Sequence, residues 1–293
     1  MQHETEGLLQ ASIIMPVHAK ASRLALTLAA LEALQPSPSY ELILVADNAS
    51  PEVMRIVTGG PWRLLETPGL GRAGARNCGA RAAKAELLIF LDDDVLVRPD
   101  FIHQHVLAQA RRPGLVHGRL REIIGLLRSD DPALGGAACP PIAAQALREG
   151  RWIPSSAMRL SASALEQAAE DPQAFDSAPW LASAGANLSL PRRLWEGIGG
   201  FDEAYGLRWG LEDLDFGFRL WRAGVTFLVA DGAIGLHMSH QSATRWTDQQ
   251  HNFERFFSMA GNCPEARALT ALLSPSGSLA AYKLRLDQIA QDA

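Results

Sequence analysis

The stretch Leu87-Leu88-Ile89-Phe90-Leu91-Asp92-Asp93-Asp94 decides the fold of this chain. Its apolar residues predict a strand buried on both faces, as is typical of a parallel sheet covered by helices. The carboxylates follow at once, so burial of the strand brings them to the carboxyl end of the sheet, where ligands of such sheets bind. Carboxylates this close repel one another without a cation. A solvated turn is the structural alternative, but the position favours a divalent-metal site that could hold a diphosphate.

Strand and helix patterns alternate on the N-terminal side of this stretch. Hydrophobic runs predict strands at Ser12–Val17, with Pro16 as its stop, and at Glu41–Ala46, Trp62–Thr67 and Glu86–Leu91; helices are predicted around Leu24, Leu28 and Leu31, at Pro51–Val57 and at Gly71–Ala85. This alternation predicts an α/β fold with a mostly parallel sheet and helices on both faces.

The pattern changes beyond Pro99. A strand is predicted at Leu115–Leu120, and Ser129–Asp176 is expected to be irregular apart from a helix at Ser161–Glu170. Order returns at Ala182–Leu190, at the helix Leu214–Ala223 and at the strand Val225–Ala230, before a helical tail from Gln241 that packs through Phe253, Phe256 and Phe257. We expect three parts, residues 1–114, 115–240 and 241–293.

The composition is that of an ordinary globular protein. The chain has 293 residues and a net charge of −5, and this slight acidity argues against a nucleic acid as its main partner. Cys78, Cys139 and Cys263 fit no zinc spacing and suit a reducing compartment. No apolar run reaches the roughly 20 residues of a membrane span. The first residues lack the basic region of a signal peptide. We therefore expect a cytoplasmic protein without a transmembrane segment.

The glycines of Gly69-Leu70-Gly71-Arg72-Ala73-Gly74 match the dinucleotide fingerprint G-x-G-x-x-G. The motif follows a predicted strand, opens a helix and precedes an acidic cluster by about 20 residues, as that fingerprint requires. It comes, however, after two earlier strand–helix passes, and its helix carries Arg76 and Asn77 where apolar packing is expected. An oxidoreductase that binds NAD(P) through this loop is therefore an alternative and not the leading hypothesis.

A second acidic motif, Trp209-Gly210-Leu211-Glu212-Asp213, opens the predicted helix Leu214–Ala223. Acidic residues in a first helical turn are favoured by the helix dipole, so a structural role is one interpretation. The pair also offers a general base beside an indole. Together with the acidic cluster that ends at Asp94, the motif indicates metal-dependent transfer of a sugar from a nucleotide diphosphate.

Both motifs carry a family resemblance. The segment Gly206–Phe216 closely resembles the Trp-Gly-Gly-Glu-Asp-Asp stretch of β-1,4-galactosyltransferases and the related stretch of bacterial chondroitin-type polymerases, with Leu211 in place of a glycine. Gly199–Glu203 resembles their Asn-Gly-Phe-Asp segment, and Gly71–Asn77 resembles the segment that lies beneath the nucleotide. Over residues 10 to 240 the chain resembles an inverting family 2 glycosyltransferase whose C-terminal half is galactosyltransferase-like.

The resemblance implies a GT-A fold, with residues 1–114 as the nucleotide-sugar-binding half, 115–240 as the acceptor-binding and catalytic half and 241–293 as a helical extension. It implies a single displacement with inversion, helped by Mn²⁺ or Mg²⁺. Asp213 would be the general base and Glu212 would bind the acceptor, while Trp209 would contact sugar or diphosphate.

The resemblance also assigns the donor side. Asp94 and His237 would bind the metal, with His240 as a nearby competitor of His237. Asp92 is a further metal candidate and would contact the ribose or a metal-bound water. The remaining donor-site candidates are Pro16, His18, Asp47, Asn48, Arg76 and Asp93. Because the family's second aspartate is Asn48 here, the nucleotide stays open, with UDP as the first choice over dTDP and GDP.

The acceptor stays open among a glycan, a peptide side chain and a small natural product. Two further classes compete with the transferase. A nucleotidyltransferase would carry a glycine-rich basic loop after the first strand, and Pro16-Val17-His18-Ala19 is not one. A non-catalytic sugar-binding protein would keep its tryptophans but would have no use for the carboxylate of Asp213.

Overall fold

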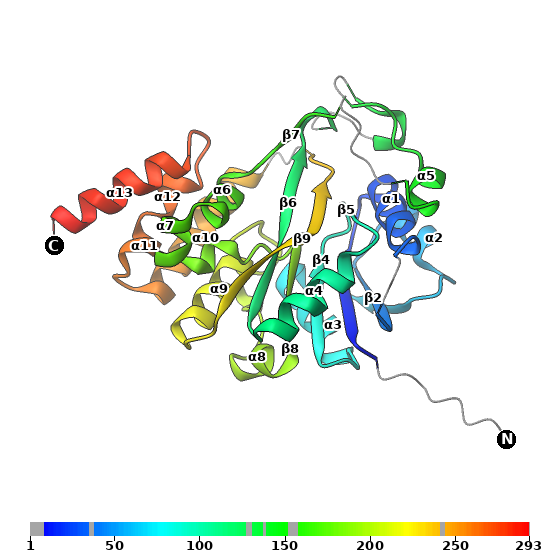
Figure 1. Ribbon diagram of the computed structural model, residues 1–293, viewed down its shortest axis with the longest axis horizontal. Helices are drawn as coiled ribbons and strands as arrows, with labels where there is room; N and C mark the ends of the chain where they lie inside the picture. The colour runs from blue at the N-terminus through cyan, green and yellow to red at the C-terminus, as the bar shows by residue number, and fades with distance from the viewer. Residues whose placement is uncertain are drawn as a thin grey trace.

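A single mixed sheet runs through the molecule (Figure 1). The computed structural model describes residues 9–34, 38–126, 131–136, 139–151, 158–240 and 244–292. The strands lie in the order β3-β2-β1-β4-β8-β6-β9-β5, and β7 pairs with β6. Their bounds are β1 (Ala11–Val17), β2 (Tyr40–Asp47), β3 (Arg63–Thr67), β4 (Leu87–Leu91), β5 (Val95–Val97), β6 (Leu115–Ile123), β7 (Leu160–Ser161), β8 (Asn187–Pro191) and β9 (Phe227–His237).

The first half of the sheet confirms the predicted parallel α/β pattern. Strands β3, β2, β1 and β4 are parallel, so their carboxyl ends meet at one edge. The helices that connect them are α1 (Ala21–Glu32), α2 (Pro51–Val57) and α3 (Gly71–Ala82). Pro16 does not stop β1, contrary to the prediction, because β4 pairs with β1 only over Ser12–Ile14. Near Pro16 the strand is paired on one side, where a missing N–H is tolerated.

The second half of the sheet is mixed. β8 is antiparallel to both β4 and β6, β9 is parallel to β6, and β5 is antiparallel to β9. The hydrophobic runs predicted these strands without revealing their directions, and the short β5 and the helix α4 (Phe101–Arg111) were not predicted. β9 also continues past the predicted end at Ala230, so His237 is the last residue of a strand and does not follow one.

Helices complete the second half and the tail. They are α5 (Ala144–Arg148), α6 (Ala164–Glu170), α7 (Pro172–Ser177), α8 (Arg192–Gly197), α9 (Glu212–Arg222), α10 (Arg245–Ala260), α11 (Pro264–Arg267), α12 (Leu269–Leu272) and α13 (Leu279–Gln291), with short 3₁₀ turns η1 (Ile124–Leu126), η2 (Pro132–Leu134), η3 (Pro179–Ala182) and η4 (Glu203–Tyr205). The helical tail is as predicted, and Phe253 and Phe256 are buried. Of the predicted irregular segment, residues 129–130, 137–138 and 152–157 lie outside the described residues. None of the described helices is long and apolar enough to cross a bilayer.

Two apolar layers cover the two faces of the sheet. Because strand side chains alternate, Leu88 and Phe90 of β4 join one layer while Ile89 and Leu91 join the other. The first layer contains residues of α3, α9, α10 and α13, and the second contains residues of α1, α2 and α4. The extension is therefore packed into the core, and Tyr282 of α13 is 0% exposed.

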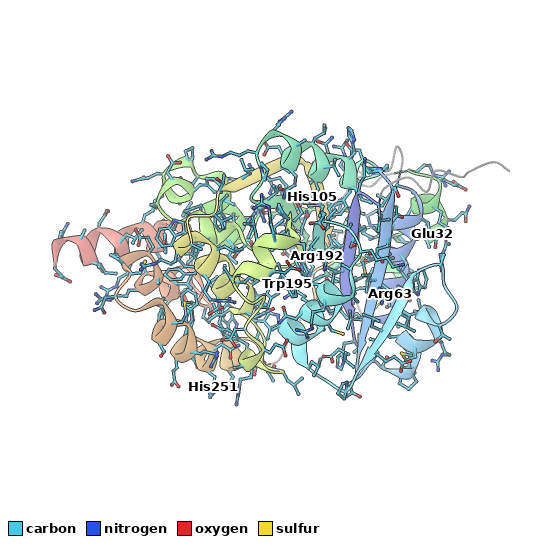
Figure 2. The ribbon with its side chains drawn as sticks, turned by 90° about the horizontal axis from the view of Figure 1, so that it is seen from below. Glu32, Arg63, His105, Arg192, Trp195 and His251 are labelled. Carbon is cyan, nitrogen blue, oxygen red and sulfur yellow. The ribbon has the colours of Figure 1, made fainter. Side chains whose placement is uncertain are left out.

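Arg192 joins the two halves at the start of α8. Its backbone N–H donates to Glu86 O at 2.7 Å, and its guanidinium donates to Ala80 O at 3.0 Å and to Ala85 O at 3.2 Å. Arg192 and Trp195 lie near the middle of Figure 2, between Glu32 and Arg63 of the first half and His251 of α10. The predicted boundary after residue 114 falls between α4 and β6, inside a continuous sheet. The three-part division thus stays a prediction about function.

Candidate active site

A cavity of about 580 Å³ lies beyond the carboxyl end of β4 and is lined by all three parts of the chain. Asp92 and Asp94 line it from the first half, Trp209–Leu214 from the second, and residues of α10 and of the turn after α12 from the extension. Within the described residues, seven buried side-chain polar atoms have no hydrogen-bond partner, and five belong to residues that line this cavity, namely Arg76, Asp94, His117, Glu212 and Gln249. Buried polar groups are nearly always satisfied, so this concentration indicates a binding site.

Asp94, His237 and His240 form a candidate metal centre. Asp94 is fully buried, and its Oδ2 lies 3.1 Å from His237 Nε2 and 3.3 Å from His240 Nε2. One ligand atom from each residue lies within 4.8 Å of the others. Asp94 Oδ1 is buried without a partner. One carboxylate and two imidazoles suit Mn²⁺ and related divalent ions, so the donor set fits the predicted metal, and both histidines are candidates.

Glu122 supports this centre from the next strand. Its Oε2 lies 2.7 Å from His237 Nδ1 and accepts from Ser239 Oγ at 2.5 Å. A carboxylate at Nδ1 fixes the imidazole orientation that directs Nε2 toward Asp94, as outer-shell carboxylates do at metal sites. Burial alone would lower the pKa of His237, but Asp94 and Glu122 raise that pKa to about 10. Burial would raise the pKa of Asp94, but His237 and Lys20 hold it well below its ordinary value.

Two cations that the sequence did not single out also line the cavity. Lys20 Nζ donates to Asp94 Oδ2 at 2.6 Å and lies 3.5 Å from Asp93 Oδ1. Burial and the neighbouring carboxylates raise the pKa of Asp93 to about 6, against the charge of Lys20, and Asp93 is not among the lining residues. Within the described part of the chain, no carboxylate forms an ion pair with Arg72. Arg72 is therefore a cation of the cavity lining that is not held in an ion pair there.

Arg76 lies between the two acidic motifs. Its side chain is 2% exposed, and it donates from Nη2 to Asp92 Oδ1 and from Nη1 to Glu212 Oε1, both at 2.9 Å. The guanidinium also lies over the Phe201 ring, 5.5 Å from the centroid. Both terminal nitrogens are thus engaged by carboxylates, and Asp92 points to Arg76 and is not part of the metal group. Arg76 unites the predicted donor and catalytic residues in one ionic cluster.

Glu212 and Asp213 start α9 inside the cavity wall. Asp213 accepts from the N–H of Gly185 at Oδ2 (3.1 Å) and from the N–H of Leu214 at Oδ1 (2.9 Å), which fixes its carboxylate. Burial and the charge of Glu212 raise the pKa of Asp213 to about 6, with Arg76 acting against them. Glu212 keeps Oε2 without a partner. One carboxylate can therefore accept a proton while its neighbour accepts a hydrogen bond.

The residue before these carboxylates has an unusual backbone. Leu211 is the N-cap of α9 and has φ of 74°, one of two positive values at non-glycine residues among those described. The family's glycine would adopt this conformation without strain, whereas a leucine pays about 1–2 kcal/mol. The turn is held from outside, because Asn252 of α10 donates to Gly210 O at 2.7 Å. Arg245 lies 4.4 Å from the ring centroid of Trp209.

The predicted nucleotide-base residues gather at the ends of β1 and β2, outside the lining of the cavity. His18 and Asn48 are exposed and Pro16 is half-buried, while His18 Nδ1 lies 2.8 Å from Asp47 O. Asn48 has a positive φ of 47°. Their assignment to the donor remains a prediction.

Asp47 fastens the loop that follows β3. Its Oδ1 accepts from Thr67 Oγ1 and from the N–H of Gly69 and Leu70, and its Oδ2 accepts from the N–H of Gly71 at 2.8 Å. The N–H groups that a dinucleotide-binding loop would offer to a pyrophosphate are therefore already used by a carboxylate. This arrangement argues against the NAD(P) alternative.

Two possible substitutes for the base are engaged elsewhere. Asp215 is 1% exposed and accepts from Arg219 Nε at 2.7 Å. Asp202 caps η4 and pairs with Arg255. The sequence brought His240 to attention only as a neighbour of His237, and Arg72 only as part of the segment Gly71–Asn77. Nothing in the local pattern marked Lys20, Glu122, His117 or Gln249, because long-range packing brings them to the cavity.

Comparison with known proteins agrees with this geometry. Residues 12–151 match the glycosyl transferase family 2 domain, and residues 175–241 match the domain described as the N-terminal domain of galactosyltransferase. A validoxylamine A glucosyltransferase of Streptomyces hygroscopicus subsp. limoneus is 30% identical over 78% of this chain and 52% of its own length. The chondroitin synthase of Escherichia coli is 25% identical over 81% of this chain and 36% of its own length. The chain thus spans about half the length of the first relative and less of the second.

Solved structures share the fold. The mannosyltransferase PcManGT of Pyrobaculum calidifontis, solved with GDP-Man and Mn²⁺, superposes with a TM-score of 0.59 at 16% identity, covering 98% of this chain and 76% of that one. Staphylococcus aureus TarS 1–349, solved with UDP, superposes with a TM-score of 0.56 at 14% identity, covering 96% of this chain and 71% of that one. The GT-A-like architecture is therefore that of the predicted class. The chain belongs to the family 2 glycosyltransferases and carries a galactosyltransferase-type domain in its second half.

Proposed function

We propose that this glycosyltransferase transfers a sugar from a nucleotide diphosphate donor, UDP first, to an acceptor hydroxyl with inversion at the anomeric carbon, aided by Mn²⁺ or Mg²⁺. One observation carries the proposal. A single cavity has the Asp94–His237–His240 group in one part of its wall and the Glu212–Asp213 pair in another, and Arg76 joins the two acidic motifs.

The donor would lie against the carboxyl edge of the first four strands. Asp94, His237 and His240 would hold the metal ion, which supplies positive charge to the departing diphosphate. Arg72 and Lys20 add cationic side chains on the same wall. Electrostatic stabilisation of a leaving diphosphate by fixed cations is among the strongest catalytic terms.

The transfer is a direct displacement. The acceptor oxygen forms a bond to the anomeric carbon while the bond from that carbon to the diphosphate oxygen breaks, and the electron pair leaves with the nucleoside diphosphate. The hydroxyl proton passes to the carboxylate of Asp213, whose orientation is fixed by the N–H groups of Gly185 and Leu214. Glu212 Oε2 accepts a hydrogen bond from the acceptor. No covalent enzyme intermediate is required, so no activated serine or cysteine is needed.

A panel of UDP-, dTDP- and GDP-sugars, each assayed for binding and hydrolysis with Mn²⁺, with Mg²⁺ and with EDTA, tests the proposal. We expect calorimetry to detect one nucleoside diphosphate in the presence of metal and to detect neither NAD nor NADP. Binding of NAD without detectable binding of any nucleoside diphosphate would refute the proposal. The acceptor class, among glycans, peptides and small natural products, then remains to be assigned.

A further inference from the structure

We propose that the C-terminal extension builds the acceptor subsite and that Gln249 on α10 selects a polyhydroxylated ring as the acceptor. This inference rests on the proposed glycosyl transfer and names its acceptor. Gln249 lines the cavity, is 2% exposed and leaves its Oε1 without a hydrogen-bond partner among the described residues. A buried amide oxygen of this kind is unfavourable unless a donor reaches it, so a ligand hydroxyl is its natural partner.

Contacts of α10 place Gln249 next to the catalytic turn. Arg245, Gln249 and Asn252 lie three or four residues apart and so share one helix face. Arg245 stacks on Trp209, and Asn252 donates to Trp209 O at 3.2 Å and to Gly210 O at 2.7 Å. Gln249, between these two contacts, therefore faces the segment that leads into Glu212. Figure 1 shows α10 on the same side of the sheet as α9 and α12.

The apolar part of the wall fits the C–H faces of a ring. Trp246 lines the cavity with 40% of its surface exposed, and the Arg245 guanidinium lies 5.4 Å from its ring centroid and 4.4 Å from that of Trp209. Leu272, Leu273 and Pro275 line the cavity from the other arm of the extension. Aromatic rings with one wet edge are suited to pack against sugar-like rings.

The turn after α12 is firmly built. Gly277 N–H donates to Ser274 O at 2.9 Å, and Ser278 N–H donates to Ala271 O at 3.1 Å. A Cβ atom at Gly277 would lie 2.2 Å from Leu272 O, so the turn requires glycine there. The wall is therefore a fixed surface that can impose specificity.

The unsatisfied groups decide the chemistry of the ligand. Glu212 Oε2 and Gln249 Oε1 can only accept hydrogen bonds. A ligand that satisfies both atoms must therefore carry two hydrogen-bond donors. Vicinal hydroxyls of a saccharide or cyclitol supply two donors and an apolar ring face at once. A serine-containing peptide offers one hydroxyl and backbone N–H donors but no ring with vicinal hydroxyls and an apolar face.

The decisive experiment replaces Gln249 by methionine, which keeps the length and removes the amide. Gln250→Met is the matched control, because Gln250 is exposed one residue further along the same helix. Lactose, cellobiose, myo-inositol and a serine-containing pentapeptide serve as probes. We expect the wild type to use a ring polyol and the KM for that acceptor to rise at least tenfold in Gln249→Met. Gln250→Met should match the wild type.

Equal acceptor KM values in the two variants, or turnover of the pentapeptide but of no ring polyol, would overturn the inference. If the wild type turns over no nucleotide sugar, the proposed function fails separately. Direct calorimetric binding of the same ring polyols to wild type, Gln249→Met and Gln250→Met then still tests the subsite, because only Gln249→Met should lose binding.

Discussion

Asp213 carries the most specific prediction at the scale of a single residue. Asp213→Asn keeps the hydrogen-bonding shape and removes the proton acceptor, so kcat should fall 10²–10⁴-fold, or about 3–5 kcal/mol of barrier. Donor affinity should change little, since Asp213 faces the acceptor hydroxyl in the proposed mechanism. Single-turnover rates at saturating substrates measure this. A rate within about threefold of wild type would show that Asp213 is not the general base. Asp215 and Asp202 are poor candidates to replace it, because each is held in an ion pair.

The raised pKa of Asp213 predicts a pH dependence. A base acts in its ionised form, and burial beside Glu212 places the pKa of Asp213 at about 6. The acceptor kcat/KM should therefore be flat above neutral pH and fall with decreasing pH through about 6, approaching tenfold per unit. A pH–rate profile checks this. The residual activity of Asp213→Asn should lack this limb, whereas an identical limb in that variant would assign the titration to another group.

The metal group gives a prediction that separates neighbouring histidines. Removal of the buried carboxylate in Asp94→Ala should abolish detectable activity and Mn²⁺ binding, whereas His237→Ala and His240→Ala should each weaken Mn²⁺ binding with smaller losses. EDTA should stop the wild-type reaction, and Mn²⁺ should restore it. Glu122→Gln is a useful comparison because it leaves the three candidate ligands in place and alters the outer contact to His237, where losses of about 10–100-fold in metal affinity are typical. Full turnover in EDTA would contradict the assignment.

At the scale of elements, the start of α9 shows how a local departure from the family pattern affects structure. Leu211 is buried and lies in the left-handed region, so its apolar packing opposes its backbone strain. Leu211→Ala and Leu211→Gly both lose the side chain, and only the glycine also loses the strain. We expect the glycine variant to be more stable than the alanine variant by about 1 kcal/mol, allowing for the greater freedom of glycine in the unfolded chain. Chemical denaturation of the two variants measures the difference. Equal stability, or a more stable alanine variant, would show that the turn is unstrained.

Element prediction succeeded where periodicity is local. The run Leu87–Leu91 and the alternation before it led to the parallel half of the sheet, because burial on both faces leaves an unbroken apolar run. The direction of β8 and the length of β9 had no such signal, since a strand has the same period in either direction.

Prediction of the site followed the same division. The sequence placed Asp94 just after a strand and Asp213 at the start of a helix, and both line the cavity, because motifs at strand and helix ends are local; the roles assigned to them stay predictions. Lys20 and Gln249 reach the cavity only through tertiary packing, from a loop before α1 and from α10, so no spacing could have assigned them. The assignment of Asp47 to the donor stays a prediction, and its hydrogen bonds to the loop at Gly69–Gly71 could not be read from the sequence.

At the scale of the whole molecule, Arg76 and Gly71 tie the first half of the chain to the second. A Cβ atom at Gly71 would lie 1.9 Å from Gly206 O, so the start of α3 packs directly on the turn that precedes Trp209. Arg76, one turn further along α3, neutralises Asp92 of the first half and Glu212 of the second. The relative position of the two acidic motifs thus depends on one helix.

Arg76→Met tests that dependence. The substitution leaves two carboxylates without their buried partner, and such losses cost about 3–5 kcal/mol, so the midpoint of thermal unfolding should fall by several degrees. Arg81→Met is the matched control on the same helix, because Arg81 pairs with Glu203 at 3.3 Å while 57% of its side chain is exposed. An exposed pair contributes at most about 1 kcal/mol, so this variant should unfold close to the wild type. Adding Glu212→Gln to Arg76→Met should recover part of the loss, since one unpaired charge is removed. If the two single variants unfold alike, the ionic link through Arg76 does not hold the halves together.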